Sequence, residues 1–208
     1  MSTTLTLIDA GAGNLQSVHK ALLAVGAAVE ISDQPDSVKR AARIVLPGVG
    51  AFGDFMAGLR TRRLVEPLLE FAAQGKPLLG ICVGMQALFD LGEELGSHPG
   101  LGLLPGRVVH FPDFPALTGE RLKVPHTGWN QLAMTDEPLF AGLQNGDYAY
   151  FNHAYYCLPG GAADVAAWTT YGVRFASAVH RNNLFGVQFH PEKSQKVGLQ
   201  ILANFINL

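Results

Sequence analysis

Short apolar runs alternate with longer amphipathic segments through the first half of the chain. The segment Asn14–Val25 carries apolar residues at every third or fourth position and is followed by Gly26, which is typical of an amphipathic helix and its stop. Alternation of strands and helices predicts βαβ units and a parallel sheet covered on both faces. The predicted strands are Leu5–Ile8, Ala28–Ile31, Arg43–Leu46 and Leu78–Ile81.

After Gly106 the pattern changes to shorter strands separated by turns, which we interpret as antiparallel additions to the sheet. The Gly- and Pro-rich stretch Glu93–Pro105 predicts a surface loop. The later strands are expected at Arg107–Phe111, Tyr148–Phe151, Val165–Thr169, Phe175–Val179 and Leu184–Gln188.

Periodicity predicts a final helix over Lys193–Asn207. Its inward residues are expected to be Val197, Ile201, Ala203 and Phe205. Together these elements predict one domain, residues 1–208, of the α/β class: an open, doubly wound, mostly parallel sheet with antiparallel additions.

Composition narrows the possible functions. Hydrophobic residues make up 48% of the 208 residues and charged ones only 15%, which suits a sheet buried on both faces. A formal net charge of −2 provides no basic footprint for nucleic acid.

Met1–Ile8 lacks the features of a signal peptide, and the apolar stretch Pro77–Leu91 is interrupted and too short to span a bilayer. Two cysteines are too few for a disulfide framework, so we expect a reducing, cytoplasmic location.

The segment Gly80–Gln86, which reads GICVGMQ, follows a predicted buried strand and opens a predicted helix. This is the sequence form of a nucleophile elbow, where flanking glycines allow strained backbone angles and leave Cys82 exposed above the sheet. A helix beginning after Cys82 favours the thiolate, and the N–H of Val83 is a natural oxyanion donor. The alternative is an inert core cysteine in a Gly-rich turn, which is how we interpret Cys157.

A thiol nucleophile needs a base, and His190 emerges at the end of an apolar strand. After Pro191 turns the chain, Glu192 is able to return toward the imidazole and fix its tautomer. The alternative is an exposed turn in which Glu192 only stabilises the positive N-terminal end of the last helix. His126 and His153 are rival bases, but neither has a carboxylate two residues away.

With Cys82, His190 and Glu192 assembled, the chain resembles the class I glutamine amidotransferase family, whose fold is flavodoxin-like. Such enzymes release ammonia from glutamine. A further segment, Pro125–Asn130, is similar to that of the glutaminase subunits of imidazole glycerol phosphate synthase, which serve a separate cyclase partner in histidine biosynthesis. The resemblance rests on the elbow and on Asp9–Leu15, Pro47–Phe52, Phe189–Ser194 and Pro125–Asn130.

The resemblance implies roles for further residues and implies no metal or cofactor. Gly48 and Gly50 flank a loop whose peptide is able to flip, as an adaptable oxyanion donor requires, although a plain tight turn is the alternative. Oxyanion donors are expected at Val49, Gly50 and Val83. Substrate contacts are expected at Gly48, Gln86, Ala154 and Tyr155. The partner interface is expected at Trp129, Asn130 and Lys193. The alternative for Trp129 is an aromatic residue of the core.

Two positions depart from the family pattern. An aromatic residue usually stands where this chain has Ala10, and a serine where it has Ala154. Ala154 therefore contributes only its backbone to any substrate contact.

Two other functions remain open at the level of sequence. One is a glutaminase serving pyridoxal phosphate, anthranilate or purine synthesis, against which the Gly128–Asn130 segment argues. The other is a non-catalytic, flavodoxin-like binding protein in which Cys82 is inert or a redox sensor.

Overall fold

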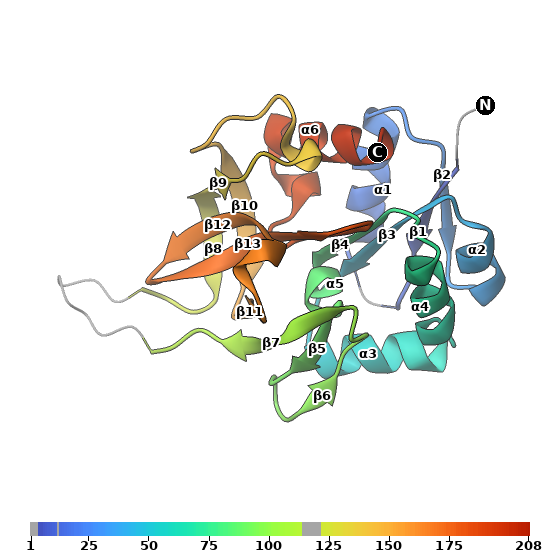
Figure 1. Cartoon of the computed structure of the whole chain (residues 1–208), viewed down its shortest axis with the longest axis horizontal. Helices are drawn as coiled ribbons and strands as arrows, with labels where there is room; N and C mark the ends of the chain where they lie inside the picture. Colours follow the sequence, from blue (N-terminus) through green and yellow to red (C-terminus); the bar gives the residue numbers. More distant parts are fainter. Residues whose placement is uncertain (1–3, 12, 114–121) are drawn as a thin grey trace.

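A mixed β-sheet runs through the centre of the molecule with helices on both faces (Figure 1). The computed structural model describes residues 4–11, 13–113 and 122–208. One half of the sheet is wholly parallel, in the order β2-β1-β3-β4-β14. Its strands are β1 (Leu5–Ile8), β2 (Val29–Ser32), β3 (Arg43–Gly48), β4 (Leu78–Cys82) and β14 (Leu184–Val187).

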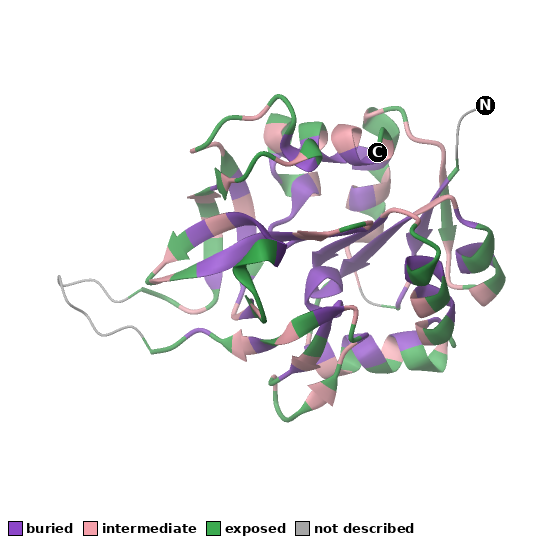
Figure 2. Cartoon of the chain, in the orientation of Figure 1, coloured by how far each residue is buried: buried purple, intermediate pink, exposed green. Residues whose placement is uncertain are grey.

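The predicted parallel strands are therefore confirmed: β1 has the predicted bounds, and the ends of β2, β3 and β4 differ by one or two residues. β1, β4 and β14 consist almost wholly of buried residues, because helices cover both sides of this half (Figure 2). That explains their nearly continuous apolar sequences. β14 was expected as an antiparallel addition, but it pairs in parallel with β4 and antiparallel only with the strand on its other side.

Helices α1 and α6 lie on one side of the sheet, and α3 and α4 lie on the other (Figure 1). Among the described residues, no helix is long and apolar enough to cross a membrane. The helices are α1 (Leu15–Ala24), α2 (Pro35–Arg40), α3 (Phe52–Thr61), α4 (Val65–Ala73), α5 (Val83–Gln86) and α6 (Gln195–Ile206), with 3₁₀ turns η1 (Pro138–Phe140), η2 (Ala162–Asp164) and η3 (Pro191–Lys193).

The last helix buries most of the predicted face, because Ile201 and Phe205 are fully buried and Val197 packs against the core. Ala203 is partly exposed, so its expected inward position is wrong. The buried residues of α6 follow a spacing of three and four along one helical face, which a stripe through Ala203 does not. They are Gly198, Ile201, Leu202 and Phe205.

Antiparallel strands extend the sheet beyond β14, in the order β13-β11-β7-β5-β6, with β12 beside β13 and β9 beside β12. The β7–β5 pair alone among these is parallel. These strands are β5 (Phe89–Gly92), β6 (His98–Pro99), β7 (Leu104–His110), β9 (Ala133–Met134), β11 (Tyr155–Pro159), β12 (Val165–Tyr171) and β13 (Val173–Arg181).

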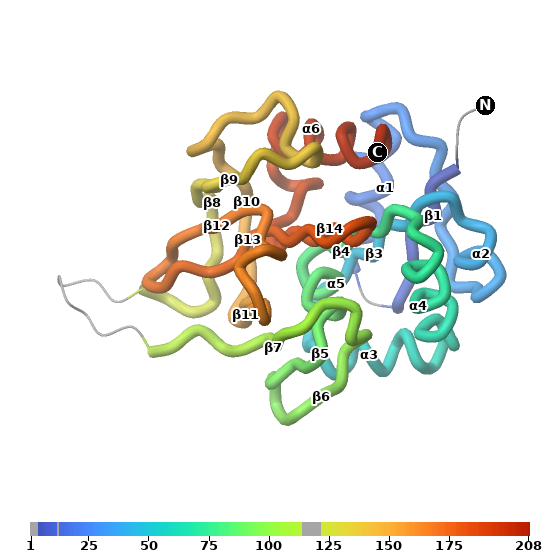
Figure 3. Tube along the Cα trace, in the orientation of Figure 1, coloured from blue at the N-terminus to red at the C-terminus, as the bar shows by residue number. Residues whose placement is uncertain are grey.

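Two expectations for this half need correction. The stretch Glu93–Pro105 is not wholly a loop, because it contains β6 and the first residues of β7. Strand β10 (Tyr148–His153) does not join the main sheet but pairs with β8 (His126–Gln131) in a separate two-stranded sheet. Figure 3 shows this small sheet beside β12 and β13, and it also shows β14 running next to β4 although the two are far apart in the chain.

Candidate active site

Three neighbouring strands end at the same edge of the sheet and bring the predicted catalytic segments together. Gly48 pairs with Cys82, so the ends of β3 and β4 are adjacent. On the other side Ile81 pairs with Val187, and the chain continues from there to His190. Ligands of open α/β sheets bind beyond these carboxyl ends, so the register itself places the thiol between the two loops.

Cys82 occupies a strained turn of the kind expected for a nucleophile elbow. Its φ of 55° and ψ of −112° are rare for a residue with a side chain, and the surrounding packing has to hold it there. A Cβ on Gly84 would lie 1.8 Å from the carbonyl oxygen of Leu46, and one on Gly80 would lie 2.6 Å from that of Gly84. Both glycines are therefore required by close backbone approach.

The helix after Cys82 is shorter than the sequence suggested. α5 contains four residues, Val83–Gln86, so its dipole at the sulfur is weaker than that of a full helix. Val83 is its first residue, and the N–H of a first residue has no partner within the helix. That N–H stays available to an oxyanion.

His190 and Glu192 form a buried pair behind the thiol. Nδ1 of His190 lies 2.9 Å from Oε1 of Glu192, with side-chain exposures of 4% and 1%. η3 follows His190 directly and returns Glu192 toward the ring, while Ser194 Oγ donates to the His190 carbonyl at 2.7 Å. The alternative of an exposed turn is therefore wrong.

The environment of His190 favours its charged form. Burial acts to lower the pKa of His190, but hydrogen bonds to Cys82 and Glu192, together with their negative charges, raise it to about 10. The imidazolium is thus the resting form at neutral pH, and Cys82 is its hydrogen-bond partner. Thiol, imidazole and carboxylate lie in the order that cysteine nucleophiles use.

A cavity of about 210 Å³ opens above the thiol. It contains Cys82 and His190 together with the predicted oxyanion and substrate residues, apart from Gly48, which is buried beside Gly84. Its lining consists of Val49, Gly50, Cys82, Val83, Gln86, Glu94, Pro125, Asn152, His153, Ala154, Tyr155, His190 and Lys193.

Sequence reasoning missed several residues of this site, of which Gln188 and Glu94 have the clearest contacts. Gln188 is fully buried, and its Nε2 lies 3.7 Å from the Cys82 sulfur. Spacing contained the signal, because Gln188 is the last residue of the predicted strand Leu184–Gln188 and lies two residues before His190. Glu94 lines the cavity and accepts a hydrogen bond from Phe52 N at 2.7 Å. No local pattern in its Gly-rich loop singles it out.

The rival histidines are not suited to be the base. His126 and His153 face each other across β8 and β10, with His126 Nδ1 3.1 Å from His153 Nε2. Burial lowers the pKa of His126 to about 4 and that of His153 to about 3. Both are neutral at pH 7 and would not hold a proton for the leaving group.

Cys157 is a core residue. Its thiol is fully buried in β11 and does not line the cavity, and burial raises its pKa well above the usual value, the Cys82 charge adding to this. A thiol held in the neutral form is a poor nucleophile.

The predicted partner residues divide into two groups. Trp129 is 46% exposed and lies edge-on to Tyr150 at 6.0 Å between ring centroids, while Lys193 Nζ lies 5.6 Å from the centre of the same ring. Asn130 instead points inward, with Nδ2 3.2 Å from His126 Nε2. An apolar cavity borders Trp129 and the 51% exposed Tyr148.

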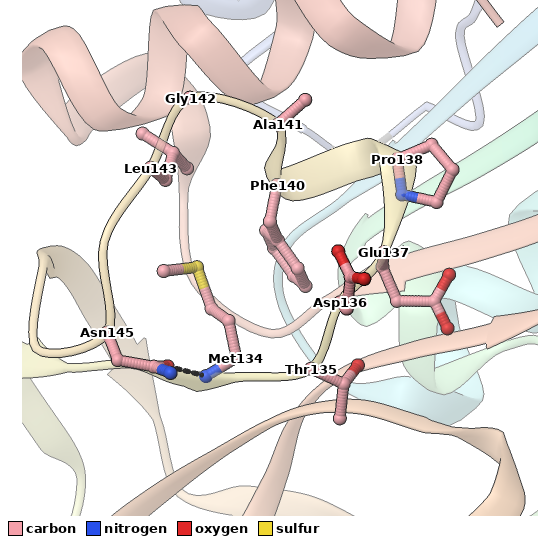
Figure 4. Close-up of a pocket in the computed structure, with 10 residues that line it drawn as sticks. All are labelled: Met134, Thr135, Asp136, Glu137, Pro138, Phe140, Ala141, Gly142, Leu143 and Asn145. Atoms are coloured by element: carbon pink, nitrogen blue, oxygen red, sulfur yellow. Dashed lines mark hydrogen bonds between the residues drawn. The ribbon is translucent and has the colours of Figure 1, made fainter.

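A larger cavity of about 600 Å³ lies elsewhere, between β9 and the segment after it (Figure 4). The loop curls around a hollow into which Met134 and Phe140 project. Two of its polar side chains already have partners within the protein: Glu137 Oε2 lies 2.6 Å from His180 Nδ1, and Asn145 Oδ1 accepts from Met134 N. It contains no cysteine or histidine, so the smaller cavity is the candidate active site.

Comparison with protein families and curated proteins gives a consistent result. Residues 6–208 match the model of the family described as glutamine amidotransferase class-I. The imidazole glycerol phosphate synthase subunit HisH of Syntrophotalea carbinolica is 50% identical over 202 residues, which are 97% of this chain and 98% of the relative. The subunit of the same name from Salinibacter ruber is 49% identical, covering 98% of this chain and 94% of the relative.

Solved structures share the fold at lower identity. PurLQS from Thermotoga maritima superposes with a TM-score of 0.76 at 19% identity, covering 100% of this chain and 99% of that one. A structure titled glutamine amidotransferase superposes with a TM-score of 0.73 at 17% identity, covering 98% and 99%. These two likenesses show the α/β fold alone.

Proposed function

Because the chain belongs to the class I glutamine amidotransferase family, we propose that it is the glutaminase subunit of an imidazole glycerol phosphate synthase. It hydrolyses the side-chain amide of glutamine and supplies the ammonia to a cyclase partner in histidine biosynthesis. The observation that carries the proposal is that Cys82 and His190 line one cavity, with Oε1 of Glu192 2.9 Å from Nδ1 of the His190 ring. Two free thiols fit a reducing, cytoplasmic location.

In the first half of the reaction, the Cys82 thiolate attacks the amide carbon of glutamine. The oxyanion receives hydrogen bonds from Val83 N–H and from the Val49–Gly50 peptide, both at the cavity wall. His190 then gives its proton to the nitrogen, the C–N bond breaks, and ammonia leaves a glutamyl thioester. The raised pKa of His190 ensures that the proton is present when the amine departs.

In the second half, the now neutral His190 takes a proton from water while the oxygen attacks the thioester carbon. The C–S bond breaks, glutamate leaves, and the thiolate–imidazolium pair returns. Glu192 keeps Nδ1 of the ring protonated and directed away, so that Nε2 serves both steps.

The cavity fits a glutamine molecule with its amide at the sulfur. Glu94 supplies a carboxylate for the substrate ammonium group, which is a role that the sequence did not reveal. The backbone at Ala154 and Tyr155 and the side chain of Gln86 form the wall around the substrate, while Gly48 supports this wall from behind, beside Gly84. An alanine at 154 provides no hydroxyl, in keeping with a backbone contact.

Partner binding is proposed for the surface formed by Trp129, Asn130 and Lys193, with the Tyr150 ring between Trp129 and Lys193. Trp129 is a large exposed aromatic beside an apolar cavity, and such side chains often anchor protein interfaces. The ammonia acceptor on the cyclase is proposed to be a phosphoribulosyl-formimino aminoimidazole carboxamide nucleotide. Amidotransferases of other pathways are the alternative, but the curated relatives at about half identity carry the synthase subunit name.

The test is ammonia release from glutamine by the purified chain, alone and with the cyclase. Glutamine hydrolysis that depends on Cys82 and rises with the cyclase is the expected result. Hydrolysis that responds only to an enzyme of another pathway would indicate the alternative amidotransferase. A chain with no hydrolysis under any condition would be a binding protein.

A further inference from the structure

A series of hydrogen bonds leads inward from strand β8 through two buried histidines. Asn130 Nδ2 lies 3.2 Å from His126 Nε2. His126 Nδ1 lies 3.1 Å from His153 Nε2, and His153 Nδ1 lies 2.8 Å from the carbonyl oxygen of Tyr155. Each imidazole therefore uses both of its nitrogens.

The same carbonyl continues the series to the nucleophile. Gln86 Nε2 donates to the Tyr155 oxygen at 3.1 Å and to Gln188 Oε1 at 3.0 Å. Because its oxygen is used in this way, Gln188 turns its amide nitrogen toward Cys82 Sγ at 3.7 Å. The amides of Gln86 and Gln188 thus depend on Tyr155 for their orientation.

The direction of the series is fixed at the Asn130 end. Asn130 Oδ1 accepts from Gln131 N at 2.8 Å, and Nδ2 donates to the Thr170 carbonyl at 3.0 Å. These two bonds identify which amide atom is nitrogen, and an amide nitrogen only donates. His126 Nε2 must accept, so its proton is on Nδ1.

The direction is also fixed at the other end. A carbonyl only accepts, so His153 carries its proton on Nδ1 and offers a bare Nε2 to His126. An extra proton on either ring would make two N–H groups face each other and would break a hydrogen bond of the series. Burial accordingly lowers the pKa of both rings, and the nearby His190 charge further lowers that of His153.

We propose that His126 and His153 are positioning residues for glutamine hydrolysis, a neutral pair locked in the Nδ1–H tautomer that holds the Tyr155 carbonyl and, through Gln86 and Gln188, the Cys82 sulfur. The inference rests on the proposed glutaminase function. It also links the site to the partner surface, because Asn130 directly follows the exposed Trp129 on β8. A partner that moves β8 at Trp129 shifts the outer end of the series.

Two variants of His126 separate this role from simple packing. The ring of His126 stacks on Tyr171 at 4.0 Å and on Phe151 at 4.8 Å between centroids. His126→Phe keeps this stacking and loses both hydrogen bonds. His126→Asn loses the ring but places an amide nitrogen close to the Nδ1 position, where it still donates to His153.

The two variants are compared in the complex with the cyclase, by steady-state glutaminase kinetics and thermal unfolding. For His126→Phe we expect a roughly tenfold lower kcat, with a smaller change in KM. For His126→Asn we expect a smaller loss of kcat but a lower melting temperature than for His126→Phe. Opposite rankings for kcat and for stability are the signature of positioning. If kcat instead follows the melting temperature, with His126→Phe as fast as the wild type, the role is packing and the inference is wrong.

A measurement on the wild-type chain does not depend on any variant folding. Nitrogen-15 NMR of the histidine rings at neutral pH is expected to show protonated Nδ1 and unprotonated Nε2 for His126 and His153. The opposite tautomer for either ring overturns the inference even when glutaminase activity is intact. Absence of any Cys82-dependent hydrolysis by the wild-type complex would instead remove the proposed function itself.

Discussion

Nδ1 of His190 lies 2.9 Å from Oε1 of Glu192 while the same ring lines the cavity together with Cys82, so one buried ring lies between a carboxylate and a thiol. The geometry gives Glu192 and Cys82 different roles. Glu192 orients the ring and stabilises its charge, whereas Cys82 attacks the substrate while His190 carries the proton to the leaving nitrogen. Each role leads to a different expectation for substitution.

Cys82→Ser is expected to fold normally and to lose glutamine hydrolysis, because a serine in the same turn is a far weaker nucleophile at neutral pH. Cys157→Ser is the matched control and is expected to retain hydrolysis while losing some stability, since it buries a hydroxyl in the core. An electrophilic glutamine analogue followed by peptide mass analysis is expected to label Cys82 alone. Labelling of Cys157 would identify the wrong thiol as nucleophile.

Glu192→Gln is expected to lower kcat less than His190→Ala, because an amide still orients the ring whereas alanine removes the proton carrier. The pKa of His190, about 10, depends on hydrogen bonds and charges from Cys82 and Glu192, so Glu192→Gln lowers it. The alkaline limit of activity, where His190 loses its proton, then moves to lower pH. A pH–rate profile measures this, and an unmoved limit or an active His190→Ala contradicts the assignment.

Activation by the partner is expected to act through the peptide between Val49 and Gly50. Hydrolysis by the isolated chain should be slow and should rise about 10²–10³-fold with cyclase and a nucleotide ligand, the effect of one oxyanion donor. Turnover of the chain alone, with cyclase, and with cyclase plus nucleotide measures it. An isolated chain as fast as the liganded complex rules out gating, even if the triad is correct.

Gly50→Ala tests the same loop without a steric clash. Gly50 has a φ of +87°, and nothing lies within 4 Å of an added Cβ, so the change acts on backbone conformation alone. We expect lower turnover in the liganded complex because the loop shifts from its native angles. Gly26→Ala is the matched control, with the same φ of +87° and the same open space at the end of α1. Equal turnover in the two variants would remove the loop from the mechanism.

Acid is expected to destabilise the chain through His126 and His153. Their pKa values fall from 6.5 to about 4 and about 3 on folding, so between these values the unfolded chain binds more protons than the folded one. The contribution of the two rings to the free energy of unfolding is complete above about pH 6.5. It declines as the pH falls toward 4 and 3, by up to about 1.4 kcal/mol per pH unit for each ring. Urea unfolding from pH 7 to 4 measures the slope. His126→Phe should reduce it, and an unchanged slope would contradict the neutral state.

The sequence by itself determined the local backbone. Strand, Gly-flanked cysteine and following turn are encoded within Gly80–Gln86, because the close approaches at Gly80 and Gly84 leave no room for a side chain. His190 and Glu192 are likewise joined by a short turn, so their contact was predictable from spacing. Strands β1, β3 and β4 followed from apolar runs that suit a sheet covered on both faces.

Only the tertiary structure decided which segments meet. The parallel pairing of β14 with β4 places His190 beside Cys82, and local patterns cannot select a strand's partner from many that match its hydrophobicity. The same holds for Glu94, which a loop brings to the cavity, and for Asn130, whose amide nitrogen lies beside His126. Whether a polar side chain donates or accepts a hydrogen bond depends on its neighbours in the folded chain. Those neighbours come from distant parts of the sequence.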